Sequence, residues 1–364
     1  MLIVLLLLSF ISLISCSKYE SNKSSFNSWK KLHNKIYSSQ EEELKYKQWS
    51  MNLKEVETLN AASSSWIAGM TKYADMSREE FAEKILMRKQ KPNTSGKHKK
   101  PRKSHDPVSS FDWRNERGGG AVSIVQDQGL VGTCWAFSAI GNVEGQHFMA
   151  TNSSINLSEE YLVDCDGTYN EENGNADCSI YGGWPYLAYQ FIIQQGGVPS
   201  DEEYPYCAGT GACYPCMAGP VNYCGPPPYY CDRDMTRANC PPKDQPHAAT
   251  ISDWSNLSQD EDELASQLME IGPLSALMDA TQLQYYESGV WTGTATPDHQ
   301  YLGCGDSMIN HAILIVGFGV DDTDGDYWSV KNSWGVDWGE DGYFRIKRGA
   351  GECAINKYVT SSYV

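Results

Sequence analysis

The sequence predicts an α+β fold in which a helical half precedes a sheet half along the chain. Apolar residues recur at helical spacing in several stretches before residue 272, whereas strand-like apolar runs begin at His311. Elements segregated in this way pack as two layers or lobes. The cleft between them is the natural place for a functional site.

The N-terminus has the features of an export signal. Residues 1–14 are almost entirely apolar, too short to span a bilayer, and followed by Ser15 and Cys16, which predicts a signal peptide at residues 1–17. Asn-X-Ser/Thr sequons fit a secretory route and occur at Asn22, Asn93, Asn152, Asn156 and Asn256. We expect a protein of the lysosome, the vacuole or the extracellular space, with no membrane-spanning segment.

Two helices are expected before residue 90. Apolar positions among many Lys and Glu predict the first, from Phe26 to about Asn60. Steps of three and four keep one set of its residues on a single face: Glu41, Lys45, Trp49, Asn52, Val56 and Asn60. Ser77, with Glu80 three residues later, predicts a second helix ending near Lys89. Residues 90–107 lack apolar periodicity and read as an exposed linker open to proteolysis.

Charge is distributed unevenly along the chain. Residues 1–106 contain 19 Lys and Arg against 11 Asp and Glu, whereas residues 107–364 contain 10 against 35. The basic segment and the acidic remainder are expected to attract each other. The acidic remainder argues against nucleic acid as a partner and suits an acidic compartment, where carboxylates are partly neutralised.

Cys134 follows a glycine-bearing turn and begins a stretch with helical spacing that runs to about Ala150. A thiol at a helix N-terminus faces unpaired backbone N–H groups and the positive end of the helix dipole, and both favour the thiolate. The position therefore favours a nucleophile, with a structural half-cystine as the alternative.

Further elements are predicted in the acidic part. Helices are expected at Ser158–Cys165, Trp184–Gln195 and Ser258–Ile271, the last with Ser258 and Glu261 as a capping box. Strands are expected at His311–Val320, Tyr327–Lys331 and Tyr343–Lys347, with a turn at Asp324–Gly325 between the first two.

A thiolate needs a base, a group that orients the base, and donors for an oxyanion. His311 is favoured over His147, His247 and His299 because it heads a predicted strand in the half opposite Cys134. Asn332 ends the next strand and would accept from the imidazole, and Trp334 would shield that hydrogen bond. The side-chain amide of Gln128 and the backbone N–H of Cys134 would form the oxyanion hole.

Residues 207–240 contain six cysteines, many Pro and Gly, and few aliphatic residues, so disulfides must hold this Cys-rich insert. Of the twelve cysteines, Cys16 lies in the signal and Cys134 is expected to be free. Ten remain for up to five bridges: Cys165, Cys178, Cys207, Cys213, Cys216, Cys224, Cys231, Cys240, Cys304 and Cys353. A zinc site at Cys213 and Cys216 is the alternative, which even parity in an exported protein disfavours.

With these residues the chain resembles the papain-like cysteine proteases, and among them the cathepsin L-like branch, over nearly its whole length. The resemblance implies a helical lobe and a β-barrel-like lobe, with an inhibitory prosegment at residues 18–106 and a mature peptidase domain at residues 107–364. The spaced residues 41–60 and the stretch 69–75 resemble the two inhibitory motifs of that prosegment. Matched positions make Cys134 the nucleophile, His311 its ion-pair partner and general acid/base, Asn332 the orienting group and Gln128 the oxyanion donor.

The resemblance also bears on the disulfides. It implies the bridges Cys304–Cys353 and Cys165–Cys213. A further family bridge is replaced by the apolar residues Val131 and Ile180, which are expected to pack together. Cys178 is then an extra cysteine, expected to join the Cys-rich insert.

Substrate-binding residues follow by offset from the matched motifs. The pocket for the side chain two residues before the cut is expected to have walls at Trp184, Pro185, Leu277, Ile309 and Ala312, with Tyr358 at its floor. Gly182, Gly183 and Trp334 would line the substrate path.

The expected protein is an endopeptidase that acts on polypeptides, is inhibited by its own prosegment and by cystatin-type inhibitors, and is monomeric, without cofactor or metal. A cathepsin B-like exopeptidase is the alternative, because the insert falls where that enzyme has its occluding loop. The insert has no histidine with which to capture a C-terminal carboxylate. An inactive, protease-shaped binding protein is a third reading, disfavoured because Cys134, His311, Asn332 and Gln128 are all present.

Overall fold

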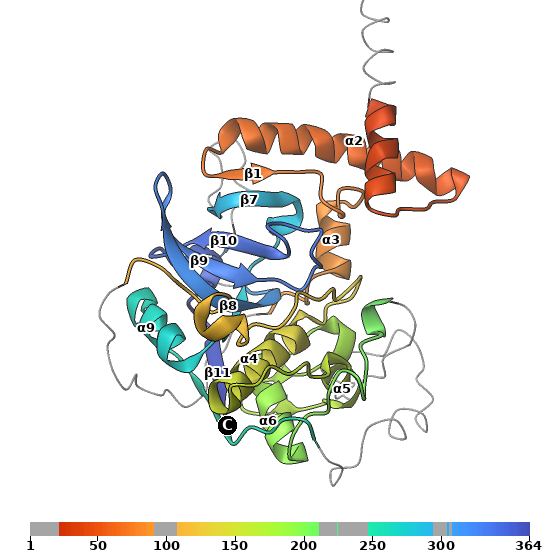
Figure 1. The fold of residues 1–364 in the computed structure, drawn as a ribbon. Coiled ribbons are helices and arrows are strands. Elements are labelled where there is room, and N and C mark those ends of the chain that lie inside the picture. Colours follow the sequence, from red (N-terminus) through yellow and green to blue (C-terminus); the bar gives the residue numbers. More distant parts are fainter. Residues whose placement is uncertain (1–21, 91–107, 211–223, 225–246, 294–303, 306–307) are drawn as a thin grey trace, which may run out of the picture.

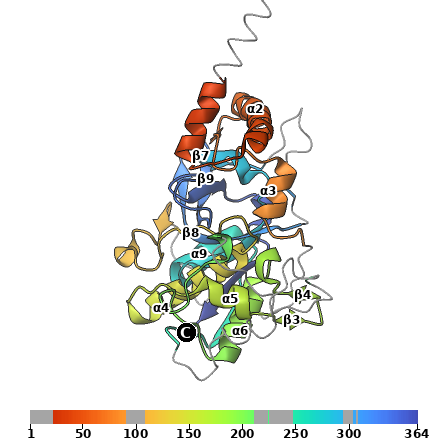
Figure 2. The same ribbon diagram turned by 90° about the vertical axis from the view of Figure 1, so that its right-hand side faces the viewer.

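The computed structural model describes residues 22–90, 108–210, 224, 247–293, 304–305 and 308–364. A layer of helices packs below a β-sheet, and the N-terminal segment lies across the opposite end of that sheet (Figure 1). Figure 2, turned by 90°, shows the same stacking of N-terminal segment, sheet and helical layer. The predicted α+β fold is confirmed.

The helical half is built around α4 (Cys134–Thr151), which is buried along most of its length. The helices α5 (Glu159–Cys165) and α6 (Pro185–Gln195) pack against it. α5 begins where predicted because the Oγ of Ser158 accepts a hydrogen bond from the N–H of Tyr161 at 3.0 Å. All three elements agree with the sequence prediction to within a residue or two.

The sheet half has the strand order β1-β7-β10-β9-β8-β6-β11-β5, with β2 paired to β8. Its strands after the linker are β2 (Phe111–Asp112), β5 (Asp253–Asn256), β6 (Leu274–Met278), β7 (Tyr286–Trp291), β8 (His311–Asp321), β9 (Gly325–Lys331), β10 (Tyr343–Lys347) and β11 (Val359–Tyr363). A separate hairpin pairs β3 (Tyr169–Asn170) with β4 (Asn175–Ala176). The three predicted strands and the turn between β8 and β9 are present. The others were missed because they are short or, like β6, buried on both faces without alternation.

Short 3₁₀ turns complete the described structure. They are η1 (Glu116–Gly119), η2 (Ser179–Tyr181), η3 (Ala208–Thr210), η4 (Leu283–Tyr285) and η5 (Glu352–Ala354). None of the described helices is long and apolar enough to cross a membrane.

The predicted cap of the helix near residue 260 is wrong by two residues. α9 (Glu261–Ile271) has Asp260 as its N-cap, whose carboxylate accepts from the N–H groups of Asp262 and Glu263 at 3.0 Å. Ser258 lies outside the helix, and its Oγ accepts from the N–H of Asp260. An aspartate two residues further on thus takes the capping role expected of Ser258.

The first helix expected before residue 90, from Phe26 to about Asn60, is two helices rather than one. A helix at 22–32 is followed by a turn at Asn34, which has a φ of 52°, and then by α2 (Ser39–Ala62). α3 (Arg78–Lys84) begins at the predicted cap Ser77 but ends five residues early, because the chain turns at Ile85 and has no regular helix from there to Gln90. The apolar pattern across 26–60 did not reveal the break.

Side chains on the predicted face of α2 form hydrogen bonds with the chain that follows this helix. Asn52 Nδ2 donates to the carbonyls of Ala74 and Met76 at 2.7 and 2.8 Å, and Lys45 Nζ lies 3.1 Å from Glu80 Oε1. β1 (Trp66–Ala68) then pairs antiparallel with β7 and extends the sheet of the C-terminal part. The N-terminal segment is therefore integrated with the rest of the fold.

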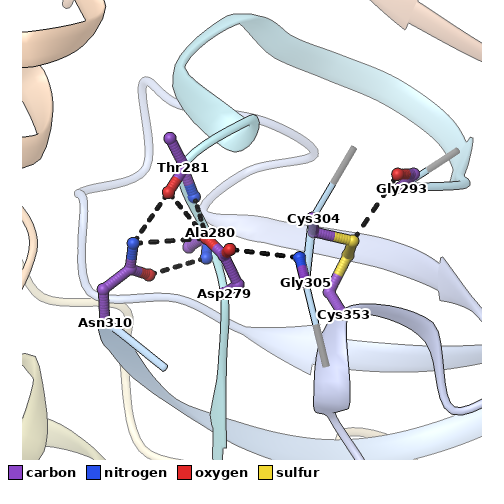
Figure 3. The surroundings of a disulfide bond; sticks show 8 residues. All are labelled: Asp279, Ala280, Thr281, Gly293, Cys304, Gly305, Asn310 and Cys353. Carbon is purple, nitrogen blue, oxygen red and sulfur yellow. Dashed lines mark hydrogen bonds between the residues drawn. A yellow bond between two sulfur atoms is a disulfide. The ribbon is translucent and has the colours of Figure 1, made fainter. Parts of the chain in front are cut away.

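Two of the expected disulfides are described. Cys304 pairs with Cys353 (Figure 3), and Cys178 pairs with Cys224, which joins it to the Cys-rich insert as predicted. Cys165 and Cys207 are each disulfide-bonded. The predicted partner Cys213 lies outside the described residues, as do Cys216, Cys231, Cys240, the signal peptide and the linker.

Candidate active site

Cys134 lies at the first turn of α4, where the helical layer meets the sheet. Its side chain is fully buried, and it is the free cysteine among the described residues. Its Sγ accepts a hydrogen bond from the backbone N–H of Ala312 in β8 at 3.4 Å. The helix and the strand therefore meet at this sulfur.

His311 begins β8 and lies beside Asn332, which follows β9. The Nε2 of His311 donates to the Oδ1 of Asn332 at 2.8 Å, and that oxygen also accepts from the N–H of Ser333. The ring of Trp334 is 4.8 Å from the imidazole, centre to centre, and is fully buried. The orienting and shielding contacts expected from the sequence are both present.

The side chain of Gln128 is also buried at this site. Its Nε2 donates to the carbonyl of Ile85 at 2.7 Å and to that of Val131 at 2.6 Å, and its Oε1 accepts from Ser333 Oγ. The amide that was expected to face an oxyanion thus binds a carbonyl of the N-terminal segment.

The N-terminal segment crosses the cleft with the end of α3 and the non-helical residues 85–90 that follow it. Phe81 packs against Trp334 with ring centres 5.4 Å apart. Further along, the N–H of Met87 donates to the carbonyl of Asn310 at 2.8 Å, and Gln90 forms a bridge with Ile309. The segment therefore passes Cys134 and continues on both sides of it.

Met87 is buried among residues that were expected to form the apolar pocket. It is 1% exposed and belongs to the same buried cluster as four of those residues, which come from both halves of the fold: Trp184, Leu277, Ile309 and Ala312. Tyr358 packs against that cluster. Pro185 is buried in the first turn of α6. Gly182 lies so close that an added Cβ would be 2.9 Å from the Cβ of Met87. Gly183 would likewise meet the ring of Trp135, so both glycines serve close approach.

A polar network supports the carbonyl that binds Met87. Asn310 Nδ2 donates to Thr281 Oγ1 at 2.8 Å and to Asp279 Oδ1 at 3.2 Å, and its Oδ1 accepts from the N–H of Ala280 (Figure 3). The sequence analysis did not single out Asn310. Its proximity to His311 was the one available signal.

Burial keeps both reactive groups neutral in this form. It raises the pKa of the Cys134 thiol to about 12, although backbone amides led by that of Ala312 lower it. It lowers the pKa of His311 to about 4, against the hydrogen bond to Asn332. His311 Nδ1 has no partner among the described residues. Desolvation by burial thus outweighs the helix N-terminus, which was expected to favour the thiolate.

Val131 and Ile180 replace a family bridge, and their segments remain joined. Gly132 N–H donates to the carbonyl of Ile180 at 2.8 Å, and the Ile180 side chain packs against the core of the helical half. Val131 is half-buried and is not part of that core among the described contacts. A backbone hydrogen bond therefore joins the two segments here, and the packing of Val131 against Ile180 stays a prediction.

A cysteine, a histidine and an asparagine at a lobe interface, covered by the chain's own N-terminal segment, have the arrangement of a thiol hydrolase in its proenzyme form. Family models agree. One for the papain family cysteine proteases matches residues 107–363, and one for the cathepsin propeptide inhibitor domain matches residues 26–81. The chain belongs to the papain family of cysteine proteases and is a thiol endopeptidase made as a zymogen.

Individual relatives cover nearly the whole chain. Cysteine proteinase 1 of Dictyostelium discoideum is 33% identical over 356 residues, covering 94% of this chain and 93% of that protein. Procathepsin L of Mus musculus is 32% identical over 365 residues, with coverages of 96% and 94%. The structure of digestive procathepsin L2 proteinase from Tenebrio molitor larval midgut matches with a TM-score of 0.72 at 28% identity, covering 94% of this chain and 100% of that one.

A buried acid pair behind the pocket was not expected from the sequence. Asp177 Oδ1 accepts from the N–H of Trp184 at 2.6 Å, and Asp166 Oδ1 accepts from that of Thr168 at 2.8 Å. The Oδ2 atoms of both carboxyls are buried without a donor among the described residues. Burial and then the charge of Asp166 raise the pKa of Asp177, and burial raises that of Asp166. The two carboxyls therefore share a proton.

This pair makes stability depend on pH. A carboxyl whose pKa is raised by folding holds its proton more tightly when folded, so its contribution is present at low pH and lost as the pH rises through the folded-state pKa. We expect Asp177→Asn, which replaces the shared proton with an amide donor, to raise the melting temperature at pH 7.5 and leave it nearly unchanged at pH 5. Thermal unfolding of the Cys134→Ala chain, with and without Asp177→Asn, measures this. An equal shift at both pH values would contradict it.

Proposed function

We propose that residues 107–364 form the mature peptidase domain and that Cys134, His311, Asn332 and Gln128 carry its chemistry. Cys134 attacks the peptide carbonyl, and His311 pairs with the thiolate and protonates the leaving amine. Asn332 holds the imidazole through its 2.8 Å hydrogen bond. Gln128 and the Cys134 N–H stabilise the oxyanion, from the place where Gln128 now binds the Ile85 carbonyl.

The path of the prosegment through the cleft is the observation that supports an endopeptidase, which cleaves within a polypeptide chain. Phe81 at the end of α3 lies against Trp334, and the non-helical residues that follow pass Gln128 and leave beyond Ile309, so the cleft accepts a polypeptide that continues at both ends. An enzyme that removes terminal dipeptides needs one end of its cleft closed.

Peptides with blocked termini test this directly. We expect the mature enzyme to cut an octapeptide with acetylated and amidated ends about as fast as the same peptide with free ends. A requirement for a free C-terminus would favour the exopeptidase.

The remaining parts of the chain have roles in biogenesis and control. We propose a signal peptide at residues 1–17 and an inhibitory prosegment at residues 18–106, with action in a lysosome, a vacuole or the extracellular space. A mature monomer with an open cleft is also a suitable target for cystatin-type inhibitors. The presence of the prosegment in the cleft supports this reading.

The pocket that holds Met87 predicts substrate preference. Its walls are apolar, and Tyr358 adds bulk but no charge, so a branched aliphatic side chain gains about 1.5–3 kcal/mol by burial whereas arginine leaves its charge unpaired. We expect leucine or valine to be preferred over arginine two residues before the cut by about tenfold in kcat/KM.

Tyr358→Glu is the variant that tests this pocket. It should raise cleavage of the arginine substrate, with Tyr358→Gln as the uncharged control of similar shape. Equal cleavage of leucine and arginine substrates by the unaltered enzyme would show that Tyr358 does not line this pocket.

A further inference from the structure

An arginine of the prosegment lies against the Cys-rich insert. The guanidinium of Arg88 is 4.3 Å from the ring centre of Tyr181, and its Nη1 donates to the carbonyl of Cys224 at 3.0 Å. The backbone N–H of Arg88 also donates to the carbonyl of Tyr181 at 3.2 Å. The face of an aromatic ring and a carbonyl oxygen each attract a cation, so together they can bind a guanidinium without a carboxylate.

Both groups are held in place by the fold. Tyr181 ends η2 and directly precedes Gly182 of the cleft. Cys224 is fully buried and is tied by its disulfide to Cys178, three residues before Tyr181. This bridge therefore fixes one residue of the Cys-rich insert at the edge of the cleft.

The position of Arg88 along the cleft can be read from its neighbours. Ile85 binds Gln128 beside Cys134, and Met87 fills the apolar pocket. Arg88 comes next, on the side away from Cys134. When a substrate residue fills the Met87 pocket, the residue one step further from the cut occupies the place of Arg88, whichever way the backbone runs.

We propose that the ring of Tyr181 and the carbonyl of Cys224 form a subsite for a cationic side chain, arginine above all, at the third substrate residue before the cut. The subsite rests on the proposed peptidase function and adds a second determinant to the apolar pocket. Glutamate there would place its charge against a carbonyl oxygen. The acidic composition of residues 107–364 favours cations further.

Matched substrates and variants test the subsite. Blocked peptides with leucine at the second position and arginine, glutamine or glutamate at the third are compared by kcat/KM within each enzyme. We expect arginine to exceed glutamine by about fivefold in the unaltered enzyme and in Tyr181→Phe, which keeps the ring, and by less than about twofold in Tyr181→Ala. No preference for arginine, or one that Tyr181→Ala leaves intact, would overturn the subsite. Failure to cut any of these peptides would count against the peptidase function itself.

The proenzyme gives a second readout that needs no change in the mature domain. Arg88→Ala should speed alkylation of Cys134 in the proenzyme several-fold, because the prosegment loses a contact with the cleft edge. Lys89→Ala is the matched control, since this neighbouring exposed cation has no ion pair with any described residue. Equal effects of the two substitutions would contradict a specific role for Arg88.

Discussion

Replacing Cys134 by alanine is expected to abolish peptide hydrolysis, because alanine offers no nucleophile and nothing else at the site can form the acyl-enzyme. The buried sulfur accepts a long hydrogen bond from the Ala312 N–H, and alanine is smaller than cysteine, so the substitution should leave the fold intact. Hydrolysis of a fluorogenic peptide after removal of the prosegment measures the effect. Full activity of Cys134→Ala would overturn the entire reading.

Gln128 gives the companion test of the oxyanion donor. Besides the carbonyl of Val131, its Nε2 binds that of Ile85 in the N-terminal segment, so the donor is aimed into the cleft. Gln128→Ala is expected to lower kcat by about 10²-fold or more, which is the usual cost of removing one oxyanion donor. Gln128→Glu is the matched variant of similar size without the amide N–H, and it should be at least as impaired. A change in KM alone would assign Gln128 to substrate binding instead.

Release of the prosegment is expected to increase the reactivity of Cys134 by more than 10³-fold. With the thiol pKa raised to about 12, only about one molecule in 10⁵ carries a thiolate at pH 7, and the neutral His311 provides no ion pair. Exposure to water removes the desolvation that causes both shifts. Rates of iodoacetamide modification, located by mass spectrometry in the proenzyme and the mature enzyme at pH 7, measure the ratio. Equal rates would show that the prosegment only blocks access.

Acid is expected to trigger that release. Burial, the largest effect, raises the pKa of the Glu80 carboxyl, but its bonds to Lys84 and Lys45 together outweigh it and the net pKa is lowered. A carboxyl with a lowered folded-state pKa contributes stability above its unfolded value of about 4.3, and that contribution is lost as the pH falls through the folded value. Lys72 of the prosegment also pairs with Asp127 of the mature domain. Protonation of Glu80 therefore loosens the prosegment.

Cleavage should follow in the linker. We expect the N-terminus of the active enzyme to lie between about Lys100 and Ser110, and Edman sequencing after activation at pH 4.5 checks it. Glu80→Gln should activate faster at pH 6 than the unaltered chain. An active form that begins before Phe81 would contradict inhibition by the cleft-bound segment.

Interactions between residues close together in the sequence were sufficient to predict many elements of this fold. The helix at Cys134, the caps at Ser77 and Ser158, and the strands β8 to β10 depend on nearby residues, so periodicity and capping residues predicted them. The sequence-distant pairing of His311 with Asn332 was also predicted, because two adjacent strands place both residues at one end of the sheet.

Other features depend on contacts between distant segments, which no local pattern reports. The apolar run at 26–60 could not reveal the break at 33–38, since a turn with helices on both sides keeps the same composition. The pairing of β1 with β7 and the proton shared by Asp166 and Asp177 likewise arise only in the folded chain.

By itself the sequence determined which residues are available for chemistry and on which elements they lie, because residue type, spacing and capping act over a few positions. Only the tertiary structure decided the ionisation of Cys134 and His311. A helix N-terminus favours the thiolate, but the desolvation that burial imposes on the thiol is larger and reverses that preference. The N-terminal segment places Met87 and Arg88 in the cleft and so marks the two positions at which we expect substrates to be selected.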